Sequence, residues 1–313
     1  MQYRRLSGTD LDVSVICLGP MRAAAQEPGN DEKSRAGERA LRHALDLGVN
    51  FLHSSYEYRT RWMMGHVLRD HPKRHDLHHV IKVPVPDFKD GERFDEAKFR
   101  LRVEEALREL HVERIALLQW MWRSEPNNDE HRLPLLGQIV DDVVAAFQKL
   151  RDEGKAGHLF TFPYTVACAE AAVATGQFAG LLAYYNLMEM EMADIFASLK
   201  RRHMGFVAIR PLYEGLLTDE RAVPSDGDRF TDPQYASAFA KRRQIAETFR
   251  REIGKSMTAF ALRIVLADPI VASLVVGLNR PEQVEGVVQA LEGPSPSVDV
   301  VQRAQELWRA GLQ

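Results

Sequence analysis

Short apolar runs alternate with longer amphipathic segments along most of the chain. The short runs have the length and composition of buried strands, and they end at glycine or at polar residues. The segments between them repeat apolar residues at helical spacing, as in residues 92–110, which is typical of a helix with one buried face. The pattern predicts eight strands, at residues 15–19, 51–53, 80–83, 115–121, 158–162, 181–184, 206–209 and 270–277. This alternation indicates the α/β class and a (β/α)8 TIM barrel.

The two ends of the chain predict additions to the barrel. Residues 3–6 and 13–18 flank a turn of Ser, Gly, Thr and Asp, so we expect an N-terminal β-hairpin. Residues 298–311 have the pattern of a C-terminal helix. Residues 221–233 are rich in Asp, Gly and Pro and predict a loop that could cover the barrel mouth. No linker interrupts the pattern, so residues 1–313 are expected to form a single domain.

The composition narrows the function without identifying it. The 41 basic and 44 acidic residues give a net charge of -3, which argues against nucleic acid as a partner. No apolar run approaches the roughly 20 residues of a membrane span, and no signal peptide is evident, so we expect a cytoplasmic protein without a membrane partner. Cys17 and Cys168 form no ligand motif. The sequence leaves the oligomeric state open.

One dense group of histidines stands at His71, His75, His78 and His79. These residues fall in a charged segment between predicted elements. We expect them to be solvated rather than to bind a metal ion.

Candidate chemistry concentrates where the predicted second strand ends, in Asn50-Phe51-Leu52-His53-Ser54-Ser55-Tyr56-Glu57-Tyr58. In a (β/α)8 barrel the reactive side chains lie at the C-terminal ends of the strands. His53, Tyr58 and Lys82 are therefore expected to form a cluster of three proton-transfer groups. Other side chains that project from strand ends are candidates for substrate binding: Arg22, Trp120, Met121, Arg123, Phe162, Arg210 and Glu214.

The same stretch resembles the signature of the aldo-keto reductases, in which a strand ends in Asp and a Tyr follows five residues later. Weaker likenesses run along nearly the whole chain, at residues 18–21, 105–110, 154–155, 185–187, 215–218 and 281–283. The resemblance implies a TIM barrel and carbonyl reduction by an Asp, Tyr, Lys and His. In that mechanism Tyr gives a proton to the carbonyl oxygen, Lys held by Asp assists it, and His orients the carbonyl. Tyr58 and Lys82 match, but His53 occupies the Asp position and Met121 the His position.

These two departures have physical consequences. A histidine cannot pair with Lys82 as an Asp would, so we expect a lowered pKa of Lys82, a neutral His53 or a reoriented lysine. Met121 can neither donate a proton nor accept a strong hydrogen bond. Losing one of two donors to a carbonyl costs about 10²–10³ in rate.

The resemblance also implies a nicotinamide dinucleotide, but the family's side-chain contacts to it are not matched here. The corresponding positions hold Phe162, Pro163, Leu182, Ile209, Gln283, Gly286 and Val287. Because contacts at both ends of the dinucleotide are affected, the expectation is that no cofactor takes part, with NADPH as the alternative.

Three hypotheses follow for function. The first is a cofactor-independent lyase, isomerase or dehydratase for a small carbonyl or sugar-like substrate, with Tyr58, Lys82 and His53 as catalytic residues. The second is a divergent NADPH-dependent carbonyl reductase. The third is a non-catalytic binding or regulatory barrel. The sequence does not identify the substrate.

Overall fold

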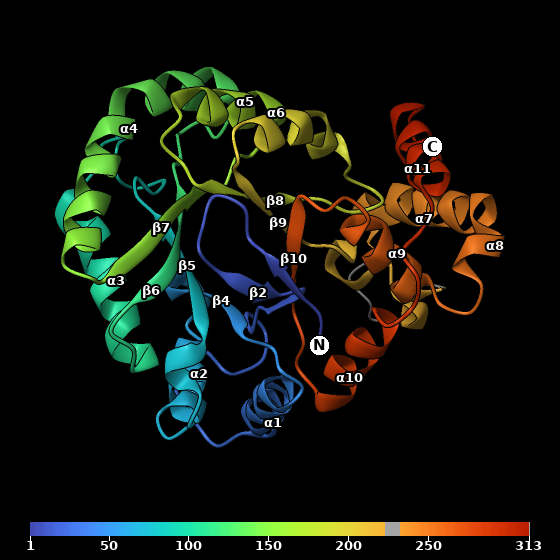
Figure 1. The fold of residues 1–313 in the computed structure, drawn as a ribbon, viewed down its shortest axis with the longest axis horizontal. Helices are drawn as coiled ribbons and strands as arrows, with labels where there is room; N and C mark the ends of the chain where they lie inside the picture. The colour runs from blue at the N-terminus through green and yellow to red at the C-terminus, as the bar shows by residue number, and fades with distance from the viewer. Residues whose placement is uncertain (223–231, 313) are drawn as a thin grey trace.

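Eight parallel strands form a closed barrel in the computed structural model, which describes residues 1–222 and 232–312 (Figure 1). The strand order around the barrel is β10-β3-β4-β5-β6-β7-β8-β9. The bounds are β3 Ile16–Leu18, β4 Phe51–Ser55, β5 His78–Pro84, β6 Ile115–Met121, β7 Ala156–Thr161, β8 Gly180–Tyr184, β9 Gly205–Ile209 and β10 Val271–Val276. The predicted (β/α)8 barrel is therefore confirmed.

The predicted N-terminal hairpin is also present, as the antiparallel pair β1 (Tyr3–Arg5) and β2 (Asp12–Ser14). Leu6, which follows β1, and Val13 of β2 are fully buried in one cluster with Phe51, the first residue of β4. The hairpin therefore covers the end of the barrel where the strands begin. The opposite end, where they finish, is left for ligands.

Helices surround the barrel (Figure 1). Their bounds are α1 Glu32–Asp46, α2 Arg61–Leu68, α3 Glu96–Leu110, α4 Asp129–Asp152, α5 Val166–Thr175, α6 Phe196–Arg201, α7 Ala236–Thr248, α8 Arg250–Ile253, α9 Met257–Leu266, α10 Pro281–Ala290 and α11 Val298–Arg309. Within the described chain, no helix is both long and apolar enough to cross a membrane. The segment expected to act as a lid lies mostly outside the described residues.

Helix α4 begins within a polar stretch of the chain. Asn128 caps the helix by accepting the backbone N–H of His131. Asp129 and Glu130 then place negative charge in the first turn, where the helix dipole favours it. The helix continues through Pro134, a residue that would be expected to interrupt it.

Two layers of side chains fill the barrel interior because successive residues of a strand point to opposite faces. The layer nearer the hairpin is apolar and includes Phe51, Val80, Leu117, Phe160, Leu182 and Val207. Two residues further along β4, β5 and β6 are His53, Lys82 and Gln119. The strand period therefore places polar side chains in the layer at the mouth.

Candidate active site

His53, Tyr58 and Lys82 lie together at the mouth, as the sequence predicted. Strand β4 pairs with β5 so that Ser55 lies opposite Lys82. Tyr58 ends the short helix η1 (Tyr56–Tyr58), which follows β4 directly. The ring centroids of His53 and Tyr58 are 6.3 Å apart, and Lys82 Nζ lies 5.2 Å from the centroid of the Tyr58 ring.

His53 is buried and neutral. Its Nε2 lies 2.7 Å from Gln119 Oε1, and since a carbonyl oxygen can only accept, Nε2 carries the hydrogen. Burial lowers the pKa of His53 to about 4, and the nearby charge of Lys82 adds to this effect, while the bond to Gln119 opposes it. His53 therefore presents an uncharged ring at pH 7.

Lys82 turns toward a carboxylate that the sequence analysis did not select. Its Nζ lies 3.4 Å from Glu57 Oε2. Burial lowers the pKa of Lys82, and the negative charge of Glu57 opposes that shift. The expected lowering of the Lys82 pKa is therefore present, and the lysine pairs with Glu57.

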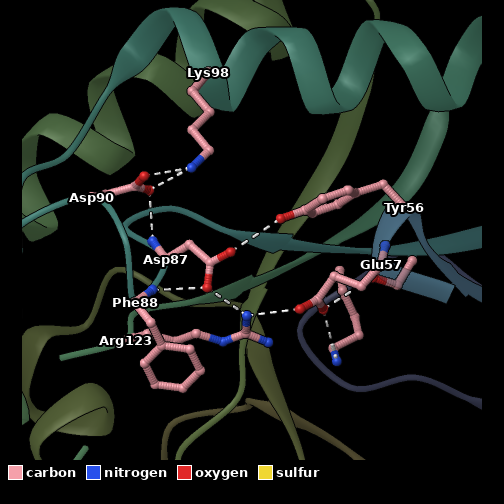
Figure 2. Close-up of polar contacts among 9 residues, drawn as sticks. Tyr56, Glu57, Asp87, Phe88, Asp90, Lys98 and Arg123 are labelled. Atoms are coloured by element: carbon pink, nitrogen blue, oxygen red, sulfur yellow. Dashed lines mark hydrogen bonds and ion pairs between the residues drawn. The ribbon is translucent and has the colours of Figure 1, made fainter. Parts of the chain in front are cut away.

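Glu57 belongs to a charged network on the β4–β6 side of the mouth (Figure 2). Arg123 Nη1 donates to Glu57 Oε1 and to Asp87 Oδ1, at 2.7 Å each. Asp87 also accepts from the Tyr56 hydroxyl at 3.3 Å and from the backbone N–H of Phe88. Burial raises the pKa of Glu57, but Arg123 and Lys82 outweigh it, so the net pKa is lowered and Glu57 is ionised.

This network corrects the expectation that Arg123 binds substrate. The residue is 8% exposed, and two carboxylates already occupy its guanidinium. Arg123 therefore holds Glu57 and Asp87 in place instead of facing the cleft.

Tyr58 keeps its proton over a wide pH range. Burial raises the pKa of its hydroxyl, and the negative charge of Glu57 raises it further. A protonated phenol at the mouth is suited to donate a proton or hydrogen bond to a substrate oxygen.

Trp120 does not reach the mouth, so its predicted contact with substrate is wrong. Gln119 points inward, and the strand period therefore turns Trp120 outward. Its Nε1 donates to the backbone oxygen of Val85 at 2.7 Å, and its ring stacks on Trp122 and Phe178. The side chain is fully buried between the barrel and its helices.

Phe162 and Met121 are buried at 2% and 4% exposure. The Phe162 ring packs edge-on against Tyr164 and Tyr184, with centroids 5.0 and 5.1 Å away. Phe162 therefore supports the aromatic wall of the mouth through Tyr184.

A cleft of about 960 Å³ extends from His53 and Tyr58 across the C-terminal ends of β9 and β10 to the start of α10. Besides His53 and Tyr58, seven of the positions selected from the sequence line it: Arg22, Ile209, Arg210, Glu214, Gln283, Gly286 and Val287. Leu182 is instead packed in the apolar layer of the barrel. Tyr184, two residues later on the same face of β8, lines the cleft in its place.

Arg210 forms part of the cleft wall. Its guanidinium lies 4.6 Å from the centroid of Tyr184 and 4.9 Å from that of Tyr213. Its nitrogens also lie 3.6 Å from carboxylate oxygens of Glu189 and Glu214. Arg22 reaches Glu214 as well, at 3.9 Å. Arg210 and Glu214 therefore pair with each other, and both line the cleft.

The far end of the cleft fits an extended anionic ligand such as a dinucleotide. Asn279 Oδ1 is buried there and has no hydrogen-bond partner among residues 1–222 and 232–312. Helix α10 begins at Pro281 after Arg280, and within the described part of the chain no side chain caps it. The exposed Arg280 guanidinium, which lines the cleft at the start of this helix, is suited to a phosphate. Ile209 also lines the cleft.

The histidine-rich segment differs from the solvated loop that was expected. Strand β5 begins at His78, and His79 is 1% exposed. Neither ring nitrogen of His79 has a hydrogen-bond partner in the described ranges. No group of His, Cys, Asp and Glu residues able to hold a metal ion occurs among the described residues.

Comparison with known proteins identifies relatives along the whole chain. The sequence matches the profile of the Aldo/keto reductase family over residues 15–309. It is 26% identical over 309 residues to L-galactose dehydrogenase of Arabidopsis thaliana, covering 93% of this chain and 88% of that protein. It is 24% identical over 299 residues to the uncharacterized oxidoreductase YqkF of Bacillus subtilis, covering 93% of this chain and 91% of that protein.

Solved structures show the same fold. The glycerol dehydrogenase of Gluconobacter oxydans superposes with a TM-score of 0.74 at 24% identity, covering 99% of this chain and 96% of that one. An aldo-keto reductase of Bacillus halodurans in its holo form gives a TM-score of 0.78 at 21% identity, with 100% and 98% covered.

These comparisons correct the expectation that no cofactor takes part. The relatives bear the names of dehydrogenases and reductases, and one of the solved structures is a holo form. Such reactions move a hydride, which amino-acid side chains do not carry and a cofactor does. Unmatched side chains at single contact positions were therefore an insufficient reason to exclude a nicotinamide cofactor.

Proposed function

Because the chain belongs to the aldo/keto reductase family, we propose that it is an oxidoreductase that uses a nicotinamide dinucleotide to interconvert a small, sugar-like carbonyl compound and its alcohol. The observation that carries the proposal is the position of Tyr58 and Lys82. Tyr58 lines the inner end of a cleft of about 960 Å³, and Lys82 Nζ lies 5.2 Å from the centroid of its ring. Proton donor and hydride carrier would therefore meet at one carbonyl.

The dinucleotide, when bound, supplies the hydride for reduction or accepts it for oxidation. Tyr58 donates its proton to the carbonyl oxygen, which becomes the hydroxyl of the product, and solvent then reprotonates Tyr58. Lys82 stabilises the developing negative charge on Tyr58 through its own positive charge. Tyr184 lines the same part of the cleft, and its hydroxyl replaces the hydrogen-bond donor that Met121 cannot provide.

Two features support a polyhydroxyl substrate. Arg210, Glu189 and Glu214 place charged hydrogen-bonding groups beside the aromatic rings of Tyr184 and Tyr213. Aromatic rings and charged groups together suit a compound with apolar faces and many hydroxyls. The relatives named above include a glycerol dehydrogenase and an L-galactose dehydrogenase, which agrees with this class.

Calorimetric titration with NADPH and NADH, followed by turnover on a panel of polyols, aldoses and small ketones, tests the proposal. Micromolar binding of either dinucleotide and dinucleotide-dependent turnover would support it. Failure of both to bind at millimolar concentration would overturn it and favour the non-catalytic barrel. Binding without turnover across the panel would also contradict the proposed substrate class.

A further inference from the structure

We propose that Glu57 is the positioning carboxylate of this active site and has taken over the role that the family gives to the residue at position 53. The proposal deepens the proposed function and rests on it for its catalytic meaning. Its structural content, that Glu57 controls the charge and position of Lys82, can be tested without turnover.

The first support is the position of Glu57 just beyond the end of β4 and close to Lys82. Strand β4 ends at Ser55, and Glu57 lies in the middle of η1, two residues beyond that end. Its Oε2 reaches within 3.4 Å of Lys82 Nζ. His53 instead pairs with Gln119, so the carboxylate that pairs with Lys82 is that of Glu57 in η1.

The second support is that both oxygens of Glu57 are held by buried groups. Oε1 accepts from Arg123 at 2.7 Å, while Oε2 accepts from the hydroxyl of Ser55 at 3.2 Å and faces Lys82. Ser55 is fully buried, and its hydroxyl also accepts the backbone N–H of Glu57. A carboxylate fixed on this many sides has little rotamer freedom, so it can define where the lysine lies.

The third support is the balance of charge. The network contains two cations, Lys82 and Arg123, and two carboxylates, Glu57 and Asp87. A neutral His53 completes this balance, whereas an Asp there would add a third negative charge. Replacing Asp by His at one position and gaining a carboxylate at another are therefore parts of one rearrangement.

Removal of the Glu57 charge has a definite consequence for Lys82. The lysine would remain buried and close to Arg123, and both conditions lower its pKa. A neutral or displaced Lys82 no longer stabilises the charge that develops on Tyr58. The loss should appear in kcat rather than in KM, because Glu57 is not expected to contact substrate.

The test is Glu57→Gln, which keeps the shape of the side chain and removes its charge. We expect the Lys82 titration, followed by NMR of lysine carbon-13-labelled at Cε, to move to lower pH. We also expect kcat at pH 7 to fall about 30-fold with KM nearly unchanged. Glu96→Gln is the matched control, because Glu96 forms an exposed ion pair with Lys149 at 2.7 Å. It should change neither quantity.

A rescue variant separates relocation of the carboxylate from a general loss of structure. His53→Asp combined with Glu57→Gln restores a carboxylate at the family position, and it should return the Lys82 titration and most of kcat. If Glu57→Gln does not fold, Glu57→Asp keeps the charge on a shorter side chain and should give an intermediate kcat.

An unchanged Lys82 titration in folded Glu57→Gln would overturn the inference, as would a rescue variant no better than the single one. Failure of the proposed function would give a different experimental result from failure of this inference. It would appear as absent dinucleotide binding in the unmodified protein, while the lysine titration still responded to Glu57.

Discussion

The two halves of the barrel mouth differ in what fills them. The charged half, on β4 to β6, consists of Glu57, Lys82, Asp87 and Arg123, joined by contacts of 2.7 to 3.4 Å. The cleft half, on β9, β10 and the start of α10, surrounds an open space of about 960 Å³. One half is filled by its own side chains, and the other is shaped to be filled by a ligand.

The difference shows two ways in which a site can retain its properties after its side chains change. In the charged half, a missing carboxylate is offset by another carboxylate two residues beyond the strand. In the cleft half, missing side-chain contacts leave the backbone shape intact, because strand ends and a helix N-terminus form the space. Substitution at a contact position therefore predicts loss of binding poorly where backbone groups supply much of the contact.

The largest expected effect separates proton donation by Tyr58 from dinucleotide binding in the cleft half. Tyr58→Phe removes the proton donor and should lower kcat about 10³-fold, which is about 4 kcal/mol in the barrier. The dissociation constant for NADPH should stay within about twofold, because the cleft half is untouched. Steady-state kinetics and calorimetry measure the two quantities.

The matched control is Tyr56→Phe. The Tyr56 hydroxyl donates to Asp87 and does not line the cleft, so kcat should change only a few-fold. Equal losses in the two variants would show that the network, and not proton donation by Tyr58, limits the reaction.

The charged half should also matter more for stability. Arg123→Met leaves Glu57 and Asp87 without their shared cation, and breaking a buried ion pair from one side typically costs about 3 kcal/mol. Urea unfolding at pH 7 measures the loss. Arg132→Met is the comparison, since Arg132 is similarly buried and forms an ion pair with one carboxylate, that of Asp129, beside a hydrogen bond to Asn127; it should lose about half as much. Equal losses would refute a special role for the doubly paired arginine.

The sequence predicted the barrel, the hairpin and the cluster of His53, Tyr58 and Lys82, because strand period and strand ends are visible in the pattern. It did not reveal that Trp120 points outward, since that depends on which of Gln119 and Trp120 faces the barrel axis. Glu57 was missed although it stands beside Tyr58. Spacing alone does not show which residue of a short turn points back toward the lysine.

Acid should lower the free energy of unfolding because of two buried histidines, one on β4 and one on β5. Burial lowers the pKa of both His53 and His79 to about 4, from an unfolded value near 6.5. Between these pH values the unfolded chain binds more protons, so stability is full above pH 6.5 and falls as the pH drops toward 4. At pH 5 each histidine should cost about 2 kcal/mol relative to pH 7.

Urea unfolding at pH 7 and pH 5 checks this prediction. His79→Leu should remove about half of the pH dependence attributable to the pair, since His79 has no hydrogen-bond partner within the described residues to lose. An unchanged pH dependence in that variant would mean that other groups dominate the acid response.

The smallest expected effect concerns the far end of the cleft. Arg280 is exposed at the start of α10 and lines the cleft there. Arg280→Ala should raise the dissociation constant for NADPH about tenfold, or about 1.4 kcal/mol, and should leave kcat at saturating NADPH unchanged. Arg309→Ala controls for loss of a surface charge. Arg309 lies on α11, away from the cleft, and pairs with Asp194. If Arg280→Ala lowered kcat and left binding unchanged, the division of the mouth into a chemical half and a binding half would be wrong.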